Sequence, residues 1–124
     1  MTTLPPPLEK DIQTAILDYL LMRGHFAWRQ NTGGIPLHGE GKEGRFRPAP
    51  VRGVSDILGV AGEPRKQAID CATVPRKGTF FAVEVKRPGK KPTADQLKFL
   101  NDVLSHGGVG IVATSVDDCI AAGL

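Results

Sequence analysis

Three charged residues stand in segments that otherwise have the composition of buried β-strands. Glu84 and Lys86 fall within residues 80–89, FFAVEVKRPG, whose aromatic and β-branched residues favour a strand in a packed sheet. Asp56 stands in GVSDIL, where it opens a second apolar segment. Because successive side chains of a strand point to opposite faces, Glu84 and Lys86 share one face. A buried charge without a partner is costly or shifts its pKa, so these residues indicate a functional site.

Asp56 and Glu84 are predicted to lie at neighbouring positions on adjacent strands. Two carboxylates that close repel each other unless a cation lies between them, and a few hard oxygen ligands favour Mg²⁺ or Mn²⁺. With the Lys86 ammonium on the same face, the set could hydrolyse a phosphodiester, since a metal lowers the pKa of bound water and cations stabilise the developing negative charge. The alternative is structural: an ion pair between Glu84 and Lys86 on an edge strand, with Asp56 capping a turn. An isolated E-x-K pattern favours that alternative.

Helices that could position these residues are indicated by apolar periodicity. An amphipathic helix is expected over residues 8–23, after three prolines and before Gly24. Its apolar stripe comprises Leu8, Ile12, Ile16, Tyr19 and Leu20. A second helix follows the capping-box pattern of Thr93 and Gln96 and ends at a Gly-Gly pair. Its inward residues are expected to be Leu97, Leu100, Val103 and Leu104. A short helix is expected over residues 115–122.

Strands are predicted between these helices, which makes the fold class α/β. The expected strands cover residues 26–30, 54–60, 79–87 and 109–114. Residues 32–53, rich in glycine and proline, are expected to form a mobile loop, and residues 61–78 a polar loop. The crossover helix makes the last two strands parallel, whereas the earlier connections suit antiparallel neighbours. The order α-β-β-β-α-β-α therefore predicts a mixed four-stranded sheet flanked by helices.

Length and composition restrict the class of protein. The chain has 124 residues, which suits a single domain over residues 1–124. With 40% hydrophobic and 23% charged residues it is typical of globular proteins, and no apolar run is long enough to span a membrane. The N-terminus lacks a secretion signal, so a cytoplasmic location is expected. Cys71 and Cys119 have no spacing that indicates a disulfide framework or a zinc site.

Basic residues outnumber acidic ones, giving a formal net charge of +3. Several of them cluster in two stretches of the sequence, at Arg45, Arg47 and Arg52 and at Lys90 and Lys91. Such clusters permit a polyanionic partner, although a solvated basic face with no partner is an equally good interpretation.

Other residue patterns give little evidence of function. Residues 39–44 match GxGxxG, but the sequence RFRPAP that follows cannot open a helix, which excludes a dinucleotide site. The three histidines, His25, His38 and His106, have no metal-ligand spacing and are expected to be loop or surface residues. Trp28 is expected to belong to the core, with base stacking as the alternative.

Over nearly its full length the sequence resembles the PD-(D/E)XK nuclease superfamily, and most closely its virus-type replication-repair nuclease (VRR-NUC) branch. The resemblance rests on an acidic residue in the first helix, the glycine-rich loop, GVSDIL, Glu84-Val85-Lys86 and the helix motif T-x-x-Q-x-x-F-L that starts at Thr93. It departs from the superfamily pattern at Ser55, where proline would stand; this position shapes the turn and supplies no ligand.

The resemblance implies a restriction-endonuclease-like fold and a set of site residues. Asp56, Glu84 and the carbonyl of Val85 would be metal ligands, and Lys86 would position or polarise the attacking water. Glu9 would be the helix carboxylate; it also projects into the apolar stripe, although a first-turn Glu favoured by the helix dipole is an equal alternative. Gln96 would be the glutamine near the site, with a capping-box role as the alternative.

The function expected from these residues is metal-dependent hydrolysis of DNA by an endonuclease. The resemblance implies a branched substrate, as for a Holliday junction resolvase in replication, recombination or repair, with Mg²⁺ or Mn²⁺ as cofactor. The basic residues Arg45, Arg47, Arg52, Lys90 and Lys91 would bind phosphates. The alternatives are a non-catalytic nucleic-acid-binding module and a restriction-type nuclease, for which 124 residues leave little room.

One catalytic set per chain can cut one strand at a time, whereas a junction or duplex has two. A homodimer is therefore expected, with its apolar contacts supplied by a helix face or by the last strand.

Overall fold

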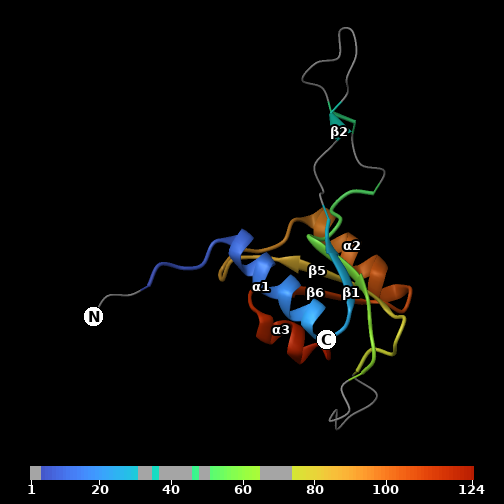
Figure 1. Ribbon diagram of the computed structural model, residues 1–124. Coiled ribbons are helices and arrows are strands. Elements are labelled where there is room, and N and C mark those ends of the chain that lie inside the picture. The colour runs from blue at the N-terminus through green and yellow to red at the C-terminus, as the bar shows by residue number, and fades with distance from the viewer. Residues whose placement is uncertain (1–3, 31–34, 37–45, 48–50, 65–73) are drawn as a thin grey trace.

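A computed structural model describes residues 4–30, 35–36, 46–47, 51–64 and 74–124 of the chain (Figure 1). The helices are α1 (Glu9–Met22), α2 (Ala94–Ser105) and α3 (Val116–Ala121). The strands are β1 (Phe26–Arg29), β2 (Ile35–Pro36), β3 (Phe46–Arg47), β4 (Ile57–Val60), β5 (Phe80–Val85) and β6 (Val109–Ala113).

Four of the strands form a mixed sheet in the order β1-β4-β5-β6. β4 pairs antiparallel with both β1 and β5, whereas β5 and β6 are parallel. This pairing confirms the predicted α/β class and the prediction that the crossover through α2 joins parallel strands. The short antiparallel pair of β2 and β3 was not predicted. Most of the loop expected over residues 32–53 lies outside the described residues.

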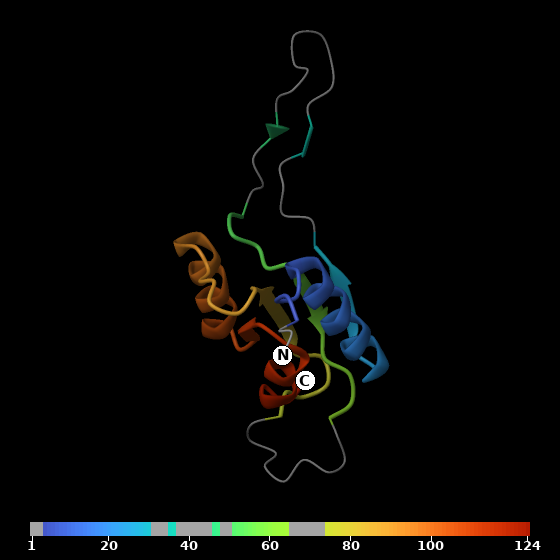
Figure 2. The same cartoon turned by 90° about the vertical axis from the view of Figure 1, so that its left-hand side faces the viewer.

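The helices cover the two faces of the sheet (Figure 2). On one face α1 and α3 pack together and on the sheet, and on the other α2 packs against β5 and β6. The main core lies under α1 and α3. Its buried residues are Ile12, Ile16, Leu20, Ala27, Ile57, Ala61, Phe81, Val83, Val85, Ala113, Cys119 and Leu124. Alternation then assigns Phe80, Ala82 and Glu84 of β5 to the α2 face.

The helix boundaries follow from local chemistry. Gly24, with φ +90°, ends the turn after α1 in a conformation that favours glycine. α2 begins with the predicted capping box: the Gln96 N–H donates to Thr93 Oγ1 at 3.2 Å, and the Thr93 N–H donates to Gln96 Oε1 at 2.8 Å.

Several side-chain predictions were wrong. Leu8 is 50% exposed because it is the N-cap residue outside the first turn of α1. Leu97 and Leu104 are 45% and 51% exposed, because α2 sits so closely on β6 that only Leu100 is buried. A Cβ added at Gly110 would lie 3.0 Å from the Leu100 carbonyl oxygen, which shows how close the helix approaches. The inward stripe of α2 is therefore narrower than predicted.

Two of the three histidines are described, and they differ. His25, expected in a loop or at the surface, is buried at 6% exposure in the turn between α1 and β1. His106 is exposed at the end of α2, as expected. His38 and Cys71 lie outside the described residues.

Candidate active site

Asp56 is held where three strands meet, immediately before β4. Its backbone carbonyl accepts a hydrogen bond from the Gln30 N–H, just past the end of β1, at 2.7 Å. Its side-chain Oδ2 accepts another from the Val85 N–H, at the end of β5, at 2.8 Å. The sequence predicted that Asp56 opens the strand; it stands one residue before it, in the turn that leads into β4.

The loop that leads to Asp56 is pressed against the start of α2. Gly53 has φ +70°, and a Cβ at this position would lie 2.3 Å from the Asp95 carbonyl carbon and 2.6 Å from the Gln96 nitrogen. Any other side chain would force the loop and the helix apart. Gly53 therefore places Asp56 and the beginning of α2 in a fixed relation.

Glu84 is the candidate site residue most removed from water. It is 1% exposed, and its Oε1 lies 3.7 Å from Lys86 Nζ. Lys86 follows the end of β5, and its N–H donates to the Ala113 carbonyl at 2.9 Å, which continues the parallel ladder beyond the strand. Glu84 Oε2 is buried and has no hydrogen-bond partner among the described residues. An oxygen left in this state is costly unless a proton or a cation joins it.

The surroundings of Glu84 favour its neutral form. Burial, followed by the charge of Asp56 and by the hydrogen bond to Asp56 that only a protonated Glu84 can donate, raises the pKa of Glu84 from 4.5 to about 8. The charge of Glu9 raises this pKa further, and Lys86 opposes the shift. Asp56, Glu84, Glu9 and Lys86 are thus close enough to interact electrostatically, and the negative charges exceed the single ammonium.

Two further residues that the family resemblance implies for the site, Glu9 and Gln96, lie at its edge. Glu9, in the first turn of α1, is partly exposed and contributes to the potential at Glu84. Gln96 lies beside the Gly53 turn, but its Oε1 is engaged in the capping box with Thr93. The carbonyl implied as a ligand belongs to Val85, the residue whose N–H holds Asp56.

The candidate phosphate-binding residues are only partly described. Arg52, Lys90 and Lys91 are exposed. Arg45 lies outside the described residues, and of Arg47 only the backbone, in β3, is described. Arg52 lines a cavity of about 410 Å³ with residues of α2.

Within the described residues, no group of three or more His, Cys, Asp or Glu side chains is placed to hold a metal ion. The candidate set has two adjacent carboxylates, with Glu9 contributing from further away. None of the helices in the described part of the chain has the length and apolar character needed to cross a membrane. No protein-family model matches the sequence, and no curated protein matches it either.

The sequence interpretation missed Gln30 as a residue that supports the site. Its N–H fixes the Asp56 carbonyl, and its Oε1 accepts a hydrogen bond from Trp28 Nε1 at 3.1 Å. The sequence did place Gln30 at the end of a predicted strand. It could not show that this strand, β1, pairs with β4, the strand that begins after Asp56.

Proposed function

We propose that the chain is a divalent-metal-dependent endonuclease that hydrolyses phosphodiester bonds in DNA. The observation that carries the proposal is the buried Glu84 carboxylate, with one unpartnered oxygen, between Asp56 and Lys86. Burying the Glu84 carboxylate beside the partly exposed Asp56 carboxylate is costly unless a proton or a cation joins the two groups. A site for Mg²⁺ or Mn²⁺ gives this arrangement a purpose.

The donor set fits a hard cation. Asp56 and Glu84 would hold it, with the Val85 carbonyl as a third oxygen ligand and Glu9 contributing negative charge. When bound, the ion would lower the pKa of a water molecule and stabilise charge on the phosphate. The raised pKa of Glu84 is consistent with this role, because a cation would replace the proton that Glu84 otherwise retains.

The residues of the chain would have separate tasks. Lys86, whose ammonium lies near Glu84 Oε1, would orient the attacking water and stabilise the negative charge that develops on the phosphate. Asp56 keeps its orientation through the Val85 N–H, so the ligand geometry does not depend on the bound ion. Ser55 replaces the usual proline without supplying a ligand.

The substrate proposed is branched DNA, and this part rests on the resemblance to VRR-NUC nucleases and the restriction-endonuclease-like fold it implies. The mixed sheet, with Glu84 on β5 and Asp56 immediately before the adjacent strand β4, supports that fold assignment. The exposed cations Arg52, Lys90 and Lys91 would contact phosphates on either side of the cleavage point.

The test is a cleavage assay on labelled duplex, nicked, flap and four-way-junction DNAs of the same sequence. Each is incubated with the purified chain in Mg²⁺, in Mn²⁺ and in EDTA. We expect cleavage of branched DNA in either metal and none in EDTA. A parallel preparation of Glu84→Gln excludes a contaminating nuclease, and Glu63→Gln, a change at an exposed carboxylate, serves as the matched control.

Binding of junction DNA without cleavage in either metal would refute the enzyme and support the non-catalytic binding module. Equal cleavage of all four DNAs would leave the nuclease in place but contradict the branched substrate.

A further inference from the structure

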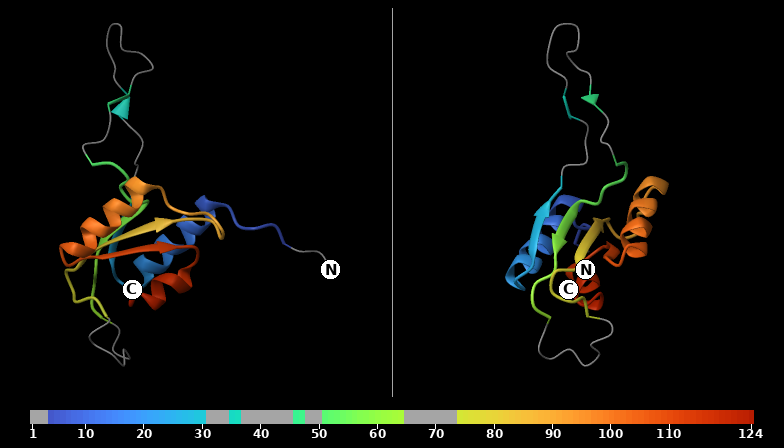
Figure 3. Two further views of the ribbon diagram at one scale, coloured as in Figure 1. Left: turned by 180° about the vertical axis from the view of Figure 1, so that it is seen from behind. Right: turned by 90° about the vertical axis from the view of Figure 1, so that its right-hand side faces the viewer.

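A cavity of about 410 Å³ lies between the segment that precedes β4 and one side of α2. Gly53 fixes these two walls relative to each other, because its backbone is packed against that of Asp95 and Gln96. Figure 3 shows the segment, drawn in green, where it passes the N-terminal end of α2, drawn in orange. The cavity is lined by Val51, Arg52, Asp95, Lys98, Phe99 and Asp102.

The cavity is close to the candidate site. Arg52 and Asp56 are four residues apart, so their Cα atoms are separated by at most ~14 Å. Because successive phosphates of one DNA strand are spaced at ~3.4 Å along the helix axis, this distance corresponds to about four nucleotides. A group bound in the cavity could therefore belong to the same DNA strand as the phosphate at Asp56 and Glu84.

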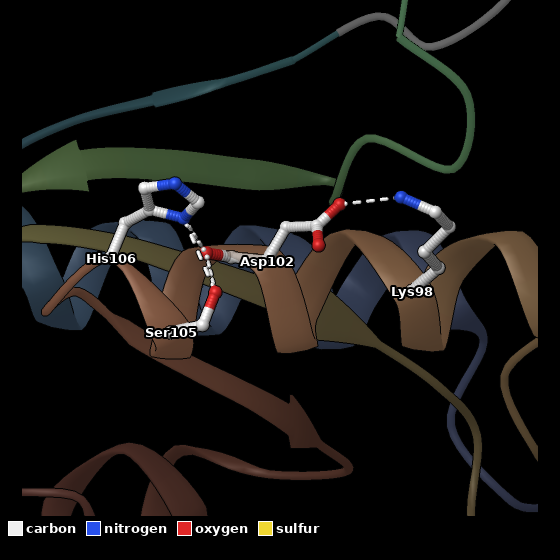
Figure 4. A network of polar contacts seen from close by, with 4 residues as sticks. All are labelled: Lys98, Asp102, Ser105 and His106. Carbon is white, nitrogen blue, oxygen red and sulfur yellow. Dashed lines mark hydrogen bonds and ion pairs between the residues drawn. The ribbon is translucent and has the colours of Figure 1, made fainter.

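The side of α2 that faces the cavity combines an aromatic ring with charges. Asp95, Phe99 and Asp102 are spaced four and three residues apart, which places them on one side of the helix. Phe99 is partly exposed. Figure 4 shows Lys98 and Asp102 projecting from α2 toward the green segment before β4, with Lys98 Nζ 2.8 Å from Asp102 Oδ2.

The charges of the cavity do not suit a phosphate group. Lys98 is paired with Asp102, whereas Arg52 and Asp95 have no ion pair within the described residues. A phosphate would be attracted by Arg52 but repelled by the carboxylates of Asp95 and Asp102. A neutral planar group with a hydrogen-bond donor and an acceptor on one edge could bond to Asp95 and Arg52 together and contact the ring of Phe99.

We propose that this cavity binds one unpaired nucleobase of the DNA substrate, an inference that rests on the proposed nuclease function. Phe99 stacks on the base, Asp95 accepts a hydrogen bond from its amino group, and Arg52 donates one to its carbonyl. Arg52 can also keep its proposed phosphate contact, because a guanidinium has five N–H donors. The volume is sufficient, since pockets for small organic molecules measure about 300–1,000 Å³.

An unpaired base specifies the class of DNA that the chain would select. A base within a duplex is stacked and paired, and it enters a protein cavity only after it leaves the stack, at a cost in free energy. The cost is least for a base that is already single-stranded, as at a branch point or in a flap. The cavity would therefore favour branched DNA over continuous duplex, which is the selectivity proposed above.

The first test addresses the cavity alone, in EDTA and without DNA. Deoxycytidine, a neutral nucleoside with an amino and a carbonyl group, is titrated at millimolar concentration while the backbone amide signals are followed by NMR. We expect saturable shifts at Arg52, Asp95 and Phe99. Deoxyribose 5-phosphate, which has a phosphate but no base, should give no comparable shifts. No shift with deoxycytidine would overturn the proposal, as would equal shifts with the sugar phosphate.

The second test measures the binding of branched DNA in EDTA by fluorescence anisotropy. A series of DNAs of one sequence carries an abasic nucleotide at each unpaired position in turn. At one position, removal of the base should weaken binding by the wild-type chain at least about fivefold, the lower limit for the loss of one base stacked on an aromatic side chain.

Variants of the cavity should lose this discrimination. Phe99→Leu keeps an apolar side chain but has no ring, so it should bind intact and abasic DNA alike. Asp95→Ala, at an exposed residue, provides a second variant if the first fails to fold, as judged by circular dichroism. The matched controls are Phe26→Leu, at an exposed ring on β1, and Asp117→Ala, at an exposed first-turn carboxylate of α3; both should keep the discrimination.

The outcomes separate the cavity from the nuclease. Equal binding of intact and abasic DNA at every position would overturn the base-binding cavity and leave the nuclease in place. Nucleoside shifts in a chain that binds no DNA would keep the base-binding cavity and refute the proposed substrate. Loss of discrimination in Phe26→Leu, but not in Phe99→Leu, would overturn the proposal and assign the base to the ring pair of Phe26 and Trp28.

Discussion

The two ends of the central sheet each bury an ionisable side chain, and they treat it in opposite ways. At one end His25 is 6% exposed; its Nε2 lies 2.9 Å from the Leu124 carbonyl, and its Nδ1 accepts the Gly62 N–H at 2.9 Å. One neutral tautomer satisfies both bonds. At the other end Glu84 is 1% exposed, its pKa is about 8, and Oε2 has no partner among the described residues.

We interpret this difference as one between a structural polar group, His25, and a group of the proposed functional site, Glu84. A buried side chain with every donor and acceptor satisfied stabilises the fold, and its removal leaves others unpaired. A buried carboxylate that keeps one oxygen without a hydrogen-bond partner beside another carboxylate costs stability, and such groups cluster at functional sites. If this interpretation is correct, mutations at the two ends will have effects of different kinds.

The largest effect is expected at the Glu84 end. Asp56→Asn and Glu84→Gln should each lower junction cleavage by at least about 10²–10³-fold, because amides are poor ligands for Mg²⁺ and charge stabilisation is removed. Calorimetry should show the loss of Mn²⁺ binding, and DNA binding should persist. His25→Ala, compared per folded molecule, is the control at the other end. Unchanged Mn²⁺ affinity in both carboxylate variants would rule out the proposed ligands.

Lys86→Ala should lower the cleavage rate by about 10²-fold while Mn²⁺ binding is kept, because the ammonium acts on water and on the phosphate rather than on the ion. Lys77→Ala is the control, since Lys77 is exposed and pairs with Glu63 at the His25 end of the sheet. Wild-type turnover by Lys86→Ala would assign Lys86 to an ion pair with Glu84 and nothing more.

The pH dependence of stability should reveal the pKa of Glu84 in the metal-free protein. Between pH ~4.5 and ~8 the folded chain binds a proton that the unfolded chain has released, so the free energy of unfolding falls as pH rises. The contribution is present in full below 4.5 and is lost as pH rises through about 8. The slope should approach about 1.4 kcal/mol per pH unit within this window.

Glu84→Gln has no such proton and should lack the slope, as measured by urea unfolding in EDTA across the window. A wild-type profile identical to that of Glu84→Gln would contradict the raised pKa.

The opposite result is expected for the other end of the sheet. His25→Ala should lower the free energy of unfolding by about 2–4 kcal/mol, because it leaves the Gly62 N–H unpaired, leaves the Leu124 carbonyl with only its longer hydrogen bond from Arg23 Nε, and removes a ring packed on Phe81. Glu84→Gln should cost little or raise stability near pH 8. Urea unfolding of both variants at one pH measures the contrast, and equal losses would remove the distinction between the two ends.

The sequence predicted those features of the two ends that depend on residues close together in the chain, and missed those that depend on residues far apart in the chain. The proximity of Glu84 to Lys86 follows from strand alternation, and the capping box of α2 spans only four residues, so both were readable locally. The environment of His25 was not, because its partners Gly62 and Leu124 are 37 and 99 residues away in the sequence. The register that brings Gln30 to Asp56 is likewise set by strand pairing rather than by local pattern.

The exposure of Leu97 and Leu104 was missed for a related reason. A periodic apolar stripe shows that a helix has an inward face but not how wide a surface the sheet offers it. Here α2 lies close on Gly110 of β6 and on Gly108, which precedes the strand, and Leu100 is the only buried residue of the helix.

The smallest effect is expected on DNA binding, from replacement of exposed Lys and Arg side chains at the two ends of the sheet. Arg52, Lys90 and Lys91 lie near the candidate site in sequence or in space, whereas Lys77 lies at the His25 end. If the first three contact phosphates, replacing all of them by alanine should weaken junction and duplex binding alike in EDTA, because phosphate contacts carry little sequence or shape information.

The slope of log affinity against log salt concentration should then decrease by about one for each cation removed from a phosphate, up to about three for the triple variant. Fluorescence anisotropy titrations at several salt concentrations measure it. Lys77→Ala should leave the slope unchanged, since its ammonium already pairs with Glu63 at 3.0 Å and lies at the end of the sheet away from Asp56. A slope that falls equally in Lys77→Ala and in Lys90→Ala would show that DNA responds to the net charge of the chain, with no preference for the end of the sheet that holds Glu84.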